Sequence, residues 1–526
     1  MRRLPIGIQD FARIRENGFC YVDKTTRIHQ LVSSSGGAFF LSRPRRFGKS
    51  LLCSTLAAIF EGKRELFGEI AGQPALSINS LEWEWKKYPV LRLDLNAEVY
   101  SNGVEALHRA LYSELQAISE QFKIPLERTD AVSQFKYLIR AICEKTGERV
   151  VIIIDEYDKP LLGSMKVPNA HEQIRDALKG FYGILKSYDK YLQFVFITGV
   201  TKFSHVSIFS DLNHLSDLTF NPEYADLCGL TQEEVELNFE PEIAVVLQER
   251  NKSREAYLES LRRYYNGYRF TKKPLTVYNP FGLLQHFDRK GEFLSYWYET
   301  GTPTFLIDLI TQQKMNIADL SNTQVSENEF GKFDIKNMSL NPLLFQTGYL
   351  TVTDYNEEKK MYLLDFPNDE VRFSFSSSLL AHYTFSTGQD SSPLTGKLIN
   401  SLFDGNIEDA IQVLRRFLAA IPYDIIGEIE KYYQTVVHLI FTMLGFNCRS
   451  EVRIAAGRID TLVETSNFVY CFEFKLDGSA DAALSQIDTK EYLLPWQGSG
   501  KKLFKVGVGF DREKRNIGEW KYETAG

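Results

Sequence analysis

The segment from residue 38 to residue 60 constrains this chain more than any other. Residues 38–41 are a short apolar run, Gly48-Lys49-Ser50 follows in a polar loop, and residues 51–60 have the apolar spacing of a helix, which gives a strand, a loop and a helix. The loop matches the pattern G-x-x-x-x-G-K-[ST], in which main-chain amides at the start of a helix surround phosphate groups, except that Arg43 replaces the first glycine. The segment therefore predicts a P-loop (Walker A motif) with one departure.

A second segment supports this interpretation. Residues 150–154 are all apolar, and Asp155 and Glu156 follow them directly, which is the pattern of a Walker B strand. We expect Lys49 to reach the β- and γ-phosphates of ATP, and Asp155 to hold a Mg²⁺-bound water beside Ser50. Glu156 would polarise the attacking water. Each motif alone is also typical of a strand that ends in solvated acids, but the two in this order favour binding of ATP and Mg²⁺.

Two further residues, Thr198 and Arg269, are candidate contacts to phosphate. Thr198 ends the apolar strand at 192–198 and fits a sensor of the γ-phosphate, although a threonine that satisfies its own turn is an equal alternative. For Arg269 an ordinary surface arginine is the favoured interpretation. The residues predicted to bind nucleotide are Arg45, Arg46, Phe47, Gly48, Lys49, Ser50, Leu51, Asp155 and Thr198, with Ser50 and Asp155 as metal ligands and Glu156 as the catalytic acid.

The order of elements predicts an α/β domain over residues 1–229. Strands at 90–95, 150–154 and 192–198 alternate with helical patterns at 103–121 and 170–187. Alternation of this kind indicates a mostly parallel sheet covered on both faces, as in P-loop NTPases of the AAA/ASCE type.

Residues 230–401 differ from residues 1–229 in their sequence pattern, and they predict a helical middle region. Within it we expect a helix at 342–350 and a hairpin of strands at 350–354 and 360–365. A helix followed by a hairpin suggests a winged helix.

Residues 402–526 predict a third domain, a restriction-endonuclease-like α/β fold. The expected order is a helix, three strands, a helix and a strand, at 425–444, 446–454, 458–464, 468–476, 480–493 and 503–510.

This last domain brings together two acids and a lysine. Asp460 and Glu473 are expected nearly opposite each other across a hairpin, and Lys475 shares a strand face with Glu473. The trio suits metal-assisted phosphodiester cleavage, with both acids as ligands of Mg²⁺ and Lys475 positioning or deprotonating the nucleophile. Glu430 would add a ligand, and Gln486 would orient water or DNA. An isolated match of this kind is usually a solvated strand, but the surrounding order of elements favours the nuclease interpretation.

These motifs resemble those of bacterial AAA-ATPase-like proteins with a C-terminal PD-(D/E)XK nuclease-superfamily domain, and the resemblance covers nearly the whole chain. It implies an ATPase fold and a nuclease fold, it makes Arg43 part of the family pattern, and it supplies no substrate. For Asp23 and Lys24, a local turn before the first helix is favoured over a nucleotide contact. The matching segments are Tyr21-Val22-Asp23-Lys24-Thr25, Arg43-Pro44-Arg45-Arg46-Phe47-Gly48-Lys49-Ser50, Asp155-Glu156-Tyr157-Asp158-Lys159-Pro160, Tyr264-Tyr265-Asn266-Gly267-Tyr268, Phe345-Gln346-Thr347-Gly348-Tyr349-Leu350 and Phe472-Glu473-Phe474-Lys475.

Composition narrows the classes of partner. A net charge of −7 gives no global attraction to nucleic acid, so DNA must be bound by a local patch. The six cysteines lie far apart and indicate neither a zinc site nor a disulfide framework. No stretch offers the ~18 consecutive apolar residues of a membrane span, and the first ten residues lack the apolar run of a secretion signal, so we expect a cytoplasmic protein.

Three functions are compatible with these motifs. The leading hypothesis is an ATPase that controls a Mg²⁺-dependent DNA nuclease, for which defence or DNA processing is a natural setting. The rival is an ATP-switched binding or sensor protein whose nuclease-like domain grips nucleic acid or protein without cutting. The third is an ATPase with a purely structural C-terminal domain. The sequence leaves oligomerisation, the trigger and the identity of an arginine finger open.

Overall fold

The chain divides into two compact units, which are described separately. The first contains residues 1–300 and 324–368, and the second contains residues 301–323 and 369–526, so the chain passes between them at 300/301, 323/324 and 368/369. The predicted division at 229/230 and 401/402 stays a prediction. The computed structural model describes residues 3–34, 37–96, 98–202, 215–299, 304–313, 320, 323–330, 340–384, 392–419, 436–437, 439–440, 447–454, 457–476 and 478–525.

A five-stranded parallel sheet forms the centre of the first unit. The strand order is β2-β3-β4-β1-β5, and every pairing is parallel. The strands are β1 (Ala38–Ser42), β2 (Val90–Asp94), β3 (Val150–Asp155), β4 (Leu192–Gly199) and β5 (Ser216–Asp217). All residues of β1 and β3 are buried, which is why these strands are continuous apolar runs in the sequence. The predicted parallel sheet is confirmed.

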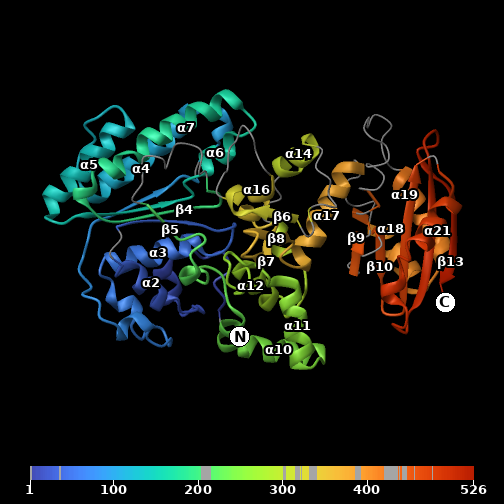
Figure 1. Cartoon of the computed structure of the whole chain (residues 1–526). Helices are drawn as coiled ribbons and strands as arrows, with labels where there is room; N and C mark the ends of the chain where they lie inside the picture. Colours follow the sequence, from blue (N-terminus) through green and yellow to red (C-terminus); the bar gives the residue numbers. More distant parts are fainter. Residues whose placement is uncertain are drawn as a thin grey trace. The chain divides into compact units, whose positions relative to one another are not determined.

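Helices cover both faces of this sheet. Figure 1 shows α4, α5 and α7 on one side and α2 and α3 on the other. The helix expected at 170–187 is divided at Gly183 into α7 and α8. The structure also contains α5, which was not among the predicted helices. The bounds are α1 (Phe11–Glu16), α2 (Thr25–Val32), α3 (Lys49–Phe60), α4 (Val104–Phe122), α5 (Ala131–Thr146), α6 (Lys159–Ser164), α7 (Pro168–Tyr182) and α8 (Ile184–Ser187).

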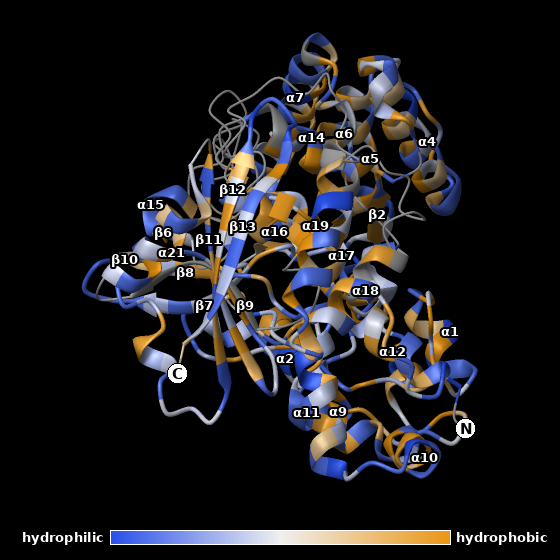
Figure 2. Ribbon diagram, turned by 90° about the vertical axis from the view of Figure 1, so that its right-hand side faces the viewer, coloured by the Kyte–Doolittle hydropathy of each residue, from blue (hydrophilic) through white to orange (hydrophobic). Residues whose placement is uncertain are grey.

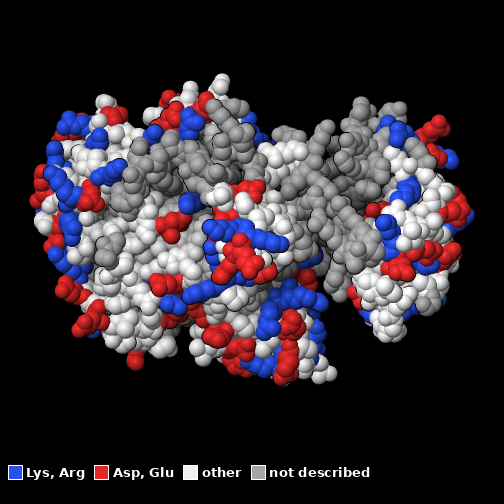
Figure 3. Space-filling view, viewed as in Figure 1, with Lys and Arg blue, Asp and Glu red and all other residues white. Residues whose placement is uncertain are grey.

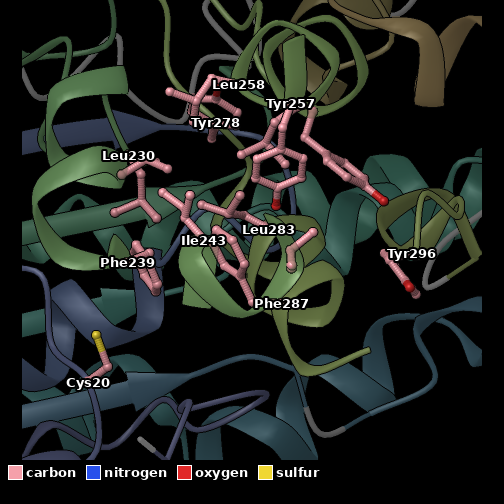
Figure 4. Close-up of a cluster of buried hydrophobic side chains, with 14 residues drawn as sticks. Cys20, Leu230, Phe239, Ile243, Tyr257, Leu258, Tyr278, Leu283, Phe287 and Tyr296 are labelled. Carbon is pink, nitrogen blue, oxygen red and sulfur yellow. The ribbon is translucent and has the colours of Figure 1, made fainter. Parts of the chain in front are cut away.

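The helical middle of the chain has its own aromatic core. Figure 4 shows this cluster, in which Phe239, Tyr257 and Phe287 pack with aliphatic side chains, and Cys20 joins them from the N-terminal segment. The helices that supply it are α9 (Gln232–Asn238), α10 (Glu240–Arg250), α11 (Arg254–Tyr265), α12 (Pro280–Asp288) and α13 (Tyr296–Glu299). Among the described residues, no helix combines the length and the apolar character that a membrane crossing requires.

A helix and a hairpin complete the first unit, as predicted. Helix α16 (Leu340–Thr347) is followed by β7 (Thr351–Asn356) and β8 (Met361–Asp365), which pair antiparallel. A third strand, β6 (Thr323–Ser326), pairs with β8 in the order β6-β8-β7, and α15 (Glu327–Phe330) follows it. The sequence did not indicate β6 because it is short and largely polar.

The second unit contains a mixed sheet in the order β13-β12-β11-β10-β9, in which only the β11–β12 pairing is parallel. Its predicted strands and the helix α21 are present, and most of the predicted helix at 425–444 lies outside the described residues. The added edge strand β13 is mostly hydrophilic, as its blue and white colours in Figure 2 show. The bounds are α14 (Thr304–Gln312), α17 (Asp369–Thr384), α18 (Ser392–Phe403), α19 (Ile407–Ala419), β9 (Asn447–Ile454), β10 (Gly457–Glu464), β11 (Phe468–Leu476), α21 (Ala480–Thr489), β12 (Lys502–Asp511) and β13 (Asn516–Ala525).

Arg43, the residue that departs from the P-loop pattern, is fully buried just after β1. Its guanidinium donates hydrogen bonds to the carbonyls of Ser42 (2.9 Å), Thr219 (3.0 Å) and Tyr224 (3.3 Å). The guanidinium carbon also lies 4.2 Å from the centre of the Phe270 ring. Burial lowers the pKa of Arg43 to about 10, so the group is still charged at neutral pH. Arg43 thus joins the end of β1 to two distant segments of the first unit.

We predict that Arg43→Met destabilises the protein. The change leaves buried carbonyls without donors, so the free energy of unfolding should fall by about 2–4 kcal/mol. Urea unfolding followed by tryptophan fluorescence measures this loss. The matched control is Arg140→Met on α5, whose side chain is half exposed and which should change stability by less than about 0.5 kcal/mol. Equal losses for the two variants would contradict the role given to Arg43.

Candidate functional site

The loop between β1 and α3 has the geometry of an anion-binding site. Gly48 precedes the helix with a φ of +91°, a left-handed conformation that favours glycine. None of the described side chains caps α3, so the amides of its first turn remain available to an anion. Arg46 also has a positive φ, of +65°, which turns the loop sharply before the helix.

Four predicted residues meet beside this loop. Lys49 is buried, and its Nζ donates to the carbonyl of Pro44 (3.2 Å) and lies 3.7 Å from Oε1 of Glu156. The side chain of Ser50 is hydrogen-bonded to Asp155 at the end of β3. Burial raises the pKa of Asp155 to about 6, although the bond to Ser50 opposes the shift. Lys49, Ser50, Asp155 and Glu156 therefore form one cluster.

The backbone at Glu156 is unusual for a residue with a side chain. Its φ is +52°, and its amide donates to Oδ1 of Asp155 (3.0 Å). A left-handed conformation at a non-glycine residue costs free energy and persists where neighbouring contacts impose it. Here it accompanies a carboxylate directed at Lys49, the geometry expected of a residue that acts on the terminal phosphate.

Two adjoining cavities lie against the loop. The first has a volume of about 330 Å³, and cationic and polar side chains line it: Gln9, Arg45, Arg46, Lys49, Ser50, Asn96, Glu156 and Lys159. The second, of about 110 Å³, is largely apolar and is lined by residues that include Cys20, Val22, Leu51, Leu227, Leu230 and Phe239. Pro5, Gly48, Leu51, Pro280 and Leu284 border both. A polar cavity joined to an apolar one fits a nucleotide, with its charged phosphates and flat base.

The two cavities include residues that the sequence did not single out. The segment from Pro5 to Gln9 and the start of α12 at Pro280 and Phe281 contribute to their walls. No local pattern marks these residues, because the fold alone brings them to the loop.

Some predicted nucleotide contacts lie elsewhere. Thr198 is fully buried within the sheet, and its hydroxyl donates to the carbonyl of Leu41 (2.7 Å), so the geometry does not support its role as a sensor. The ring of Phe47 is buried against Tyr268 and Phe270, at 4.8 and 5.5 Å between ring centres, so its side chain anchors the loop. Phe47 borders the apolar cavity and is not among the residues that line the polar one.

The structure also gives the contacts of Asp23, Lys24 and Arg269, for which a structural role was favoured over a nucleotide contact. Asp23 accepts hydrogen bonds from the amide and hydroxyl of Thr25 at the start of α2, which is the expected local turn. Lys24 pairs with Glu234 at 2.6 Å and also borders the apolar cavity. Arg269 is 8% exposed, so it is not the surface arginine that was favoured. Its guanidinium donates to the carbonyls of Thr271 (3.0 Å), Thr353 (2.9 Å) and Lys272, which gives it a structural role.

In the second unit, the four described residues of the predicted nuclease-like site converge. The pairing of Thr461 with Phe472 places Asp460 opposite Glu473. Nζ of Lys475 donates to Oε1 of Glu473 (3.0 Å) and to Oε1 of Gln486 on α21 (2.6 Å). Glu430 lies outside the described residues.

Two contacts orient these groups. Oδ2 of Asp460 accepts the amide of Phe474 (2.9 Å), which fixes the carboxylate against β11. Nε2 of Gln486 is 3.2 Å from the hydroxyl of Tyr492, so the amide oxygen of Gln486 faces Lys475. The sequence did not single out Tyr492, because a buried tyrosine near the end of a helix looks like any core aromatic residue.

Glu473 is a buried carboxylate with an oxygen that lacks a described partner. It is 1% exposed, and its Oε2 has no hydrogen-bond partner among the described residues. Burial, followed by the charge of Asp460, raises the pKa of Glu473 to about 7. An unpartnered buried carboxylate oxygen beside a second carboxylate fits a divalent cation. Within the described part of the chain, no group of three or more His, Cys, Asp and Glu side chains is arranged around a metal position.

We predict that Glu473→Gln stabilises the metal-free protein at alkaline pH. The pKa of Glu473 is about 7 in the folded state and near 4.5 in the unfolded state, so its contribution to stability is complete below 4.5 and is lost as the pH rises through 7. Removing the charge should restore about 2–3 kcal/mol at about pH 8 and much less at about pH 5. Thermal unfolding in a chelator at the two pH values measures the difference.

The control for this test is Glu491→Gln, because the side chain of Glu491 is exposed. That variant should show no pH-dependent gain. A gain from Glu473→Gln that is equal at both pH values would contradict the electrostatic explanation.

Comparison with known proteins identifies two domains in this chain. Residues 5–209 match the family model described as predicted AAA-ATPase, and residues 428–520 match the PD-(D/E)XK nuclease superfamily. A protein of Azotobacter chroococcum mcd 1, described as an uncharacterized protein in the vnfD 5′ region, is 36% identical over 539 residues, which span 100% of this chain and 99% of the relative. The chain therefore belongs to the family of predicted AAA-ATPases, here with a PD-(D/E)XK nuclease-superfamily domain at the C-terminus.

Proposed function

We propose that the protein is an ATPase whose nucleotide cycle controls a Mg²⁺-dependent DNA nuclease domain. The observation that carries the proposal is that each unit holds a buried carboxylate cluster completed by a lysine. In the first unit Lys49 lies 3.7 Å from Glu156, and in the second Lys475 lies 3.0 Å from Glu473. Lysines and acids placed in this way suit phosphate chemistry assisted by a divalent cation.

In the ATPase site, the chain's own groups divide the work. Lys49 and the first-turn amides of α3 bind the β- and γ-phosphates, while Ser50 and Asp155 hold Mg²⁺ or its water. Glu156 polarises the attacking water. The apolar cavity of about 110 Å³ receives the base, and Leu51 borders both the base and the phosphates.

In the nuclease site, Asp460 and Glu473 hold Mg²⁺, which supplies charge neutralisation and an activated water when it is bound. Lys475 positions or deprotonates the nucleophile. The contacts with Glu473 and Gln486 hold the ammonium of Lys475 at one place beside the two acids.

The turn between β12 and β13 carries charges of both signs. Arg512, Lys514 and Arg515 lie on it, and it borders an open cavity of about 800 Å³ that Asp511, Glu513 and Glu519 also line. Gly478 borders the same cavity, and a Cβ there would lie 2.8 Å from Cβ of Lys475. Lys514 is paired with Asp511 at 3.0 Å, and acidic and basic side chains are likewise interspersed on the face shown in Figure 3. The choice of DNA as the substrate therefore rests on the acids and the lysine of the nuclease-like site.

Contacts within the first unit suggest how the nucleotide would control the second. Asp158, two residues after Glu156, accepts the amides of Val200 and Thr201, and the amide of Lys202 donates to Oε1 of Gln346 (2.9 Å). Gln346 belongs to the segment 324–368, and at both of its ends the chain continues into the second unit. A shift at the Walker B residues would thus act on a segment that is covalently tied to the nuclease domain.

We predict that Lys49→Ala weakens ATP binding by about 100-fold, which is about 2.7 kcal/mol, because it removes the buried cation that is proposed to bind the β- and γ-phosphates. Calorimetric titration with Mg²⁺ and a non-hydrolysable ATP analogue measures the affinity. Lys63→Ala, which removes a half-exposed lysine beyond α3, is the control and should bind normally. Unchanged affinity in Lys49→Ala would refute the ATPase proposal.

We also predict Mg²⁺- or Mn²⁺-dependent nicking of supercoiled DNA by the unaltered protein. Lys475→Ala and Asp460→Ala should each reduce nicking by about 100-fold or more, because each removes a group that acts on the scissile phosphate. Conversion of supercoiled to open-circular plasmid measures the rate, with and without ATP. Lys490→Ala, at the end of α21, is the control.

The same assay tests the rival function. DNA binding without cutting by the unaltered protein would support the ATP-switched binding protein. Nicking that is equal with and without ATP, and unchanged in Lys49→Ala, would retain the nuclease and reject its control by nucleotide.

A further inference from the structure

The P-loop contains three arginines, and the structure gives them different partners. Arg43 donates to main-chain carbonyls, as described above. The guanidinium carbon of Arg46 lies 4.9 Å from the centre of the Phe281 ring. Arg45 is half-buried and lines the polar cavity, and its guanidinium has no hydrogen bond or ion pair with any described residue. A half-buried cation in a polar cavity without an anionic partner indicates a site that awaits an anion.

Arg45 shares the polar cavity with two residues of the proposed ATPase site. Lys49 and Glu156 line the same cavity, and Nζ of Lys49 lies 3.7 Å from Oε1 of Glu156. The guanidinium of Arg46 instead packs on the ring of Phe281, next to Pro280, which borders the apolar cavity as well. Of these two arginines, Arg45 is therefore the one that its contacts with the described residues leave available to an anion.

The backbone of Arg45 is held on two sides. Nε1 of Trp297 donates to the carbonyl of Arg45 (2.9 Å). Gly348, with a φ of +90°, lies so close to the loop that a Cβ there would come within 2.8 Å of Cβ of Pro44. These contacts fix the start of the side chain, so the guanidinium needs little reorganisation when charge develops nearby.

We propose that Arg45 recognises the γ-phosphate and stabilises the charge that develops on it during hydrolysis, so that a single chain hydrolyses ATP without an arginine from a second copy. The inference rests on the proposed ATPase function. In the step concerned, the water oxygen bonds to the γ-phosphorus, the bond to the bridging oxygen breaks, and its electron pair stays on ADP. The proton of the water passes by way of Glu156 to the released phosphate or to solvent. The two positive charges of Arg45 and Lys49 then act on the same phosphate from one loop.

The first test is binding, which does not depend on turnover. Calorimetry compares Mg²⁺-ADP with a Mg²⁺-bound non-hydrolysable ATP analogue in the unaltered protein, Arg45→Ala and Arg45→Lys. Arg45→Ala should lose about tenfold or more in affinity for the analogue and much less for ADP, and Arg45→Lys should fall between. Equal losses for both nucleotides would overturn γ-phosphate recognition, and circular dichroism checks that the variants fold.

The second test is turnover. Arg45→Ala should lower kcat by about 100-fold or more, and turnover per chain in the unaltered protein should be constant over a range of about 100-fold in protein concentration. A mixture of Arg45→Ala with Lys49→Ala should stay inactive, whereas added guanidinium ion should restore part of the Arg45→Ala rate. Arg140→Ala, on the exposed face of α5, should hydrolyse ATP normally.

The outcomes separate this inference from the proposed function. An unaltered protein that binds no ATP refutes both. A protein that hydrolyses ATP, but with turnover that rises with concentration, with activity regained in the mixture, or with normal turnover in Arg45→Ala, overturns the cis arginine and leaves the ATPase intact. Binding of ATP without any hydrolysis also overturns it.

Discussion

The architecture of the first unit depends on the buried guanidinium of Arg43. A glycine at this position would let the loop turn and would contact nothing, whereas Arg43 bonds to the carbonyls of Thr219 and Tyr224 and stacks on Phe270. Phe47 adds a second attachment through Tyr268 and Phe270. The loop that faces the phosphates is thus part of the core that the aromatic middle region builds. With the guanidinium of Arg43 held in that core, Arg45, Arg46 and Lys49 are the cations of the loop that line the polar cavity.

Both sites contain an acid that burial keeps from ionising easily. The pKa of Asp155 is raised to about 6 and that of Glu473 to about 7, and in each case the first cause is removal from water. An ionised carboxylate in such a place destabilises the folded chain until a cation arrives. A divalent cation bound at either site would therefore raise the stability of the folded chain, and the gain would be largest at a pH at which both acids are ionised.

The sequence was most informative where a strand is buried on both faces. β1 and β3 are continuous apolar runs because helices cover the sheet on either side, and the acids after β3 could be placed at its end by that logic alone. The hairpin of Asp460 and Glu473 was predictable for a related reason, since antiparallel register follows from counting residues to the turn.

Other features could not be predicted from the sequence. The edge strand β13 was not predicted because pairing with β12, rather than apolar content, stabilises it. The role of Thr198 stayed open because a strand-end hydroxyl can bond to a neighbouring strand, as it does here to the carbonyl of Leu41, as readily as to a ligand, and the sequence does not distinguish the two. The residues from Pro5 to Gln9 and Phe281 were not predicted to line the cavity, because residues so far apart in the sequence meet only through the complete fold.

The interleaving of the two units has a consequence for how this protein can be divided or recombined. Residues 301–323, with α14, belong to the second unit but precede a segment of the first in the chain. A single cleavage or fusion point near residue 368 would separate α14 from its partner helix α17 and leave the nuclease-like unit incomplete. Exchange of one unit between relatives thus requires joints at 300/301, 323/324 and 368/369, so neither unit can be moved as one continuous segment of the chain.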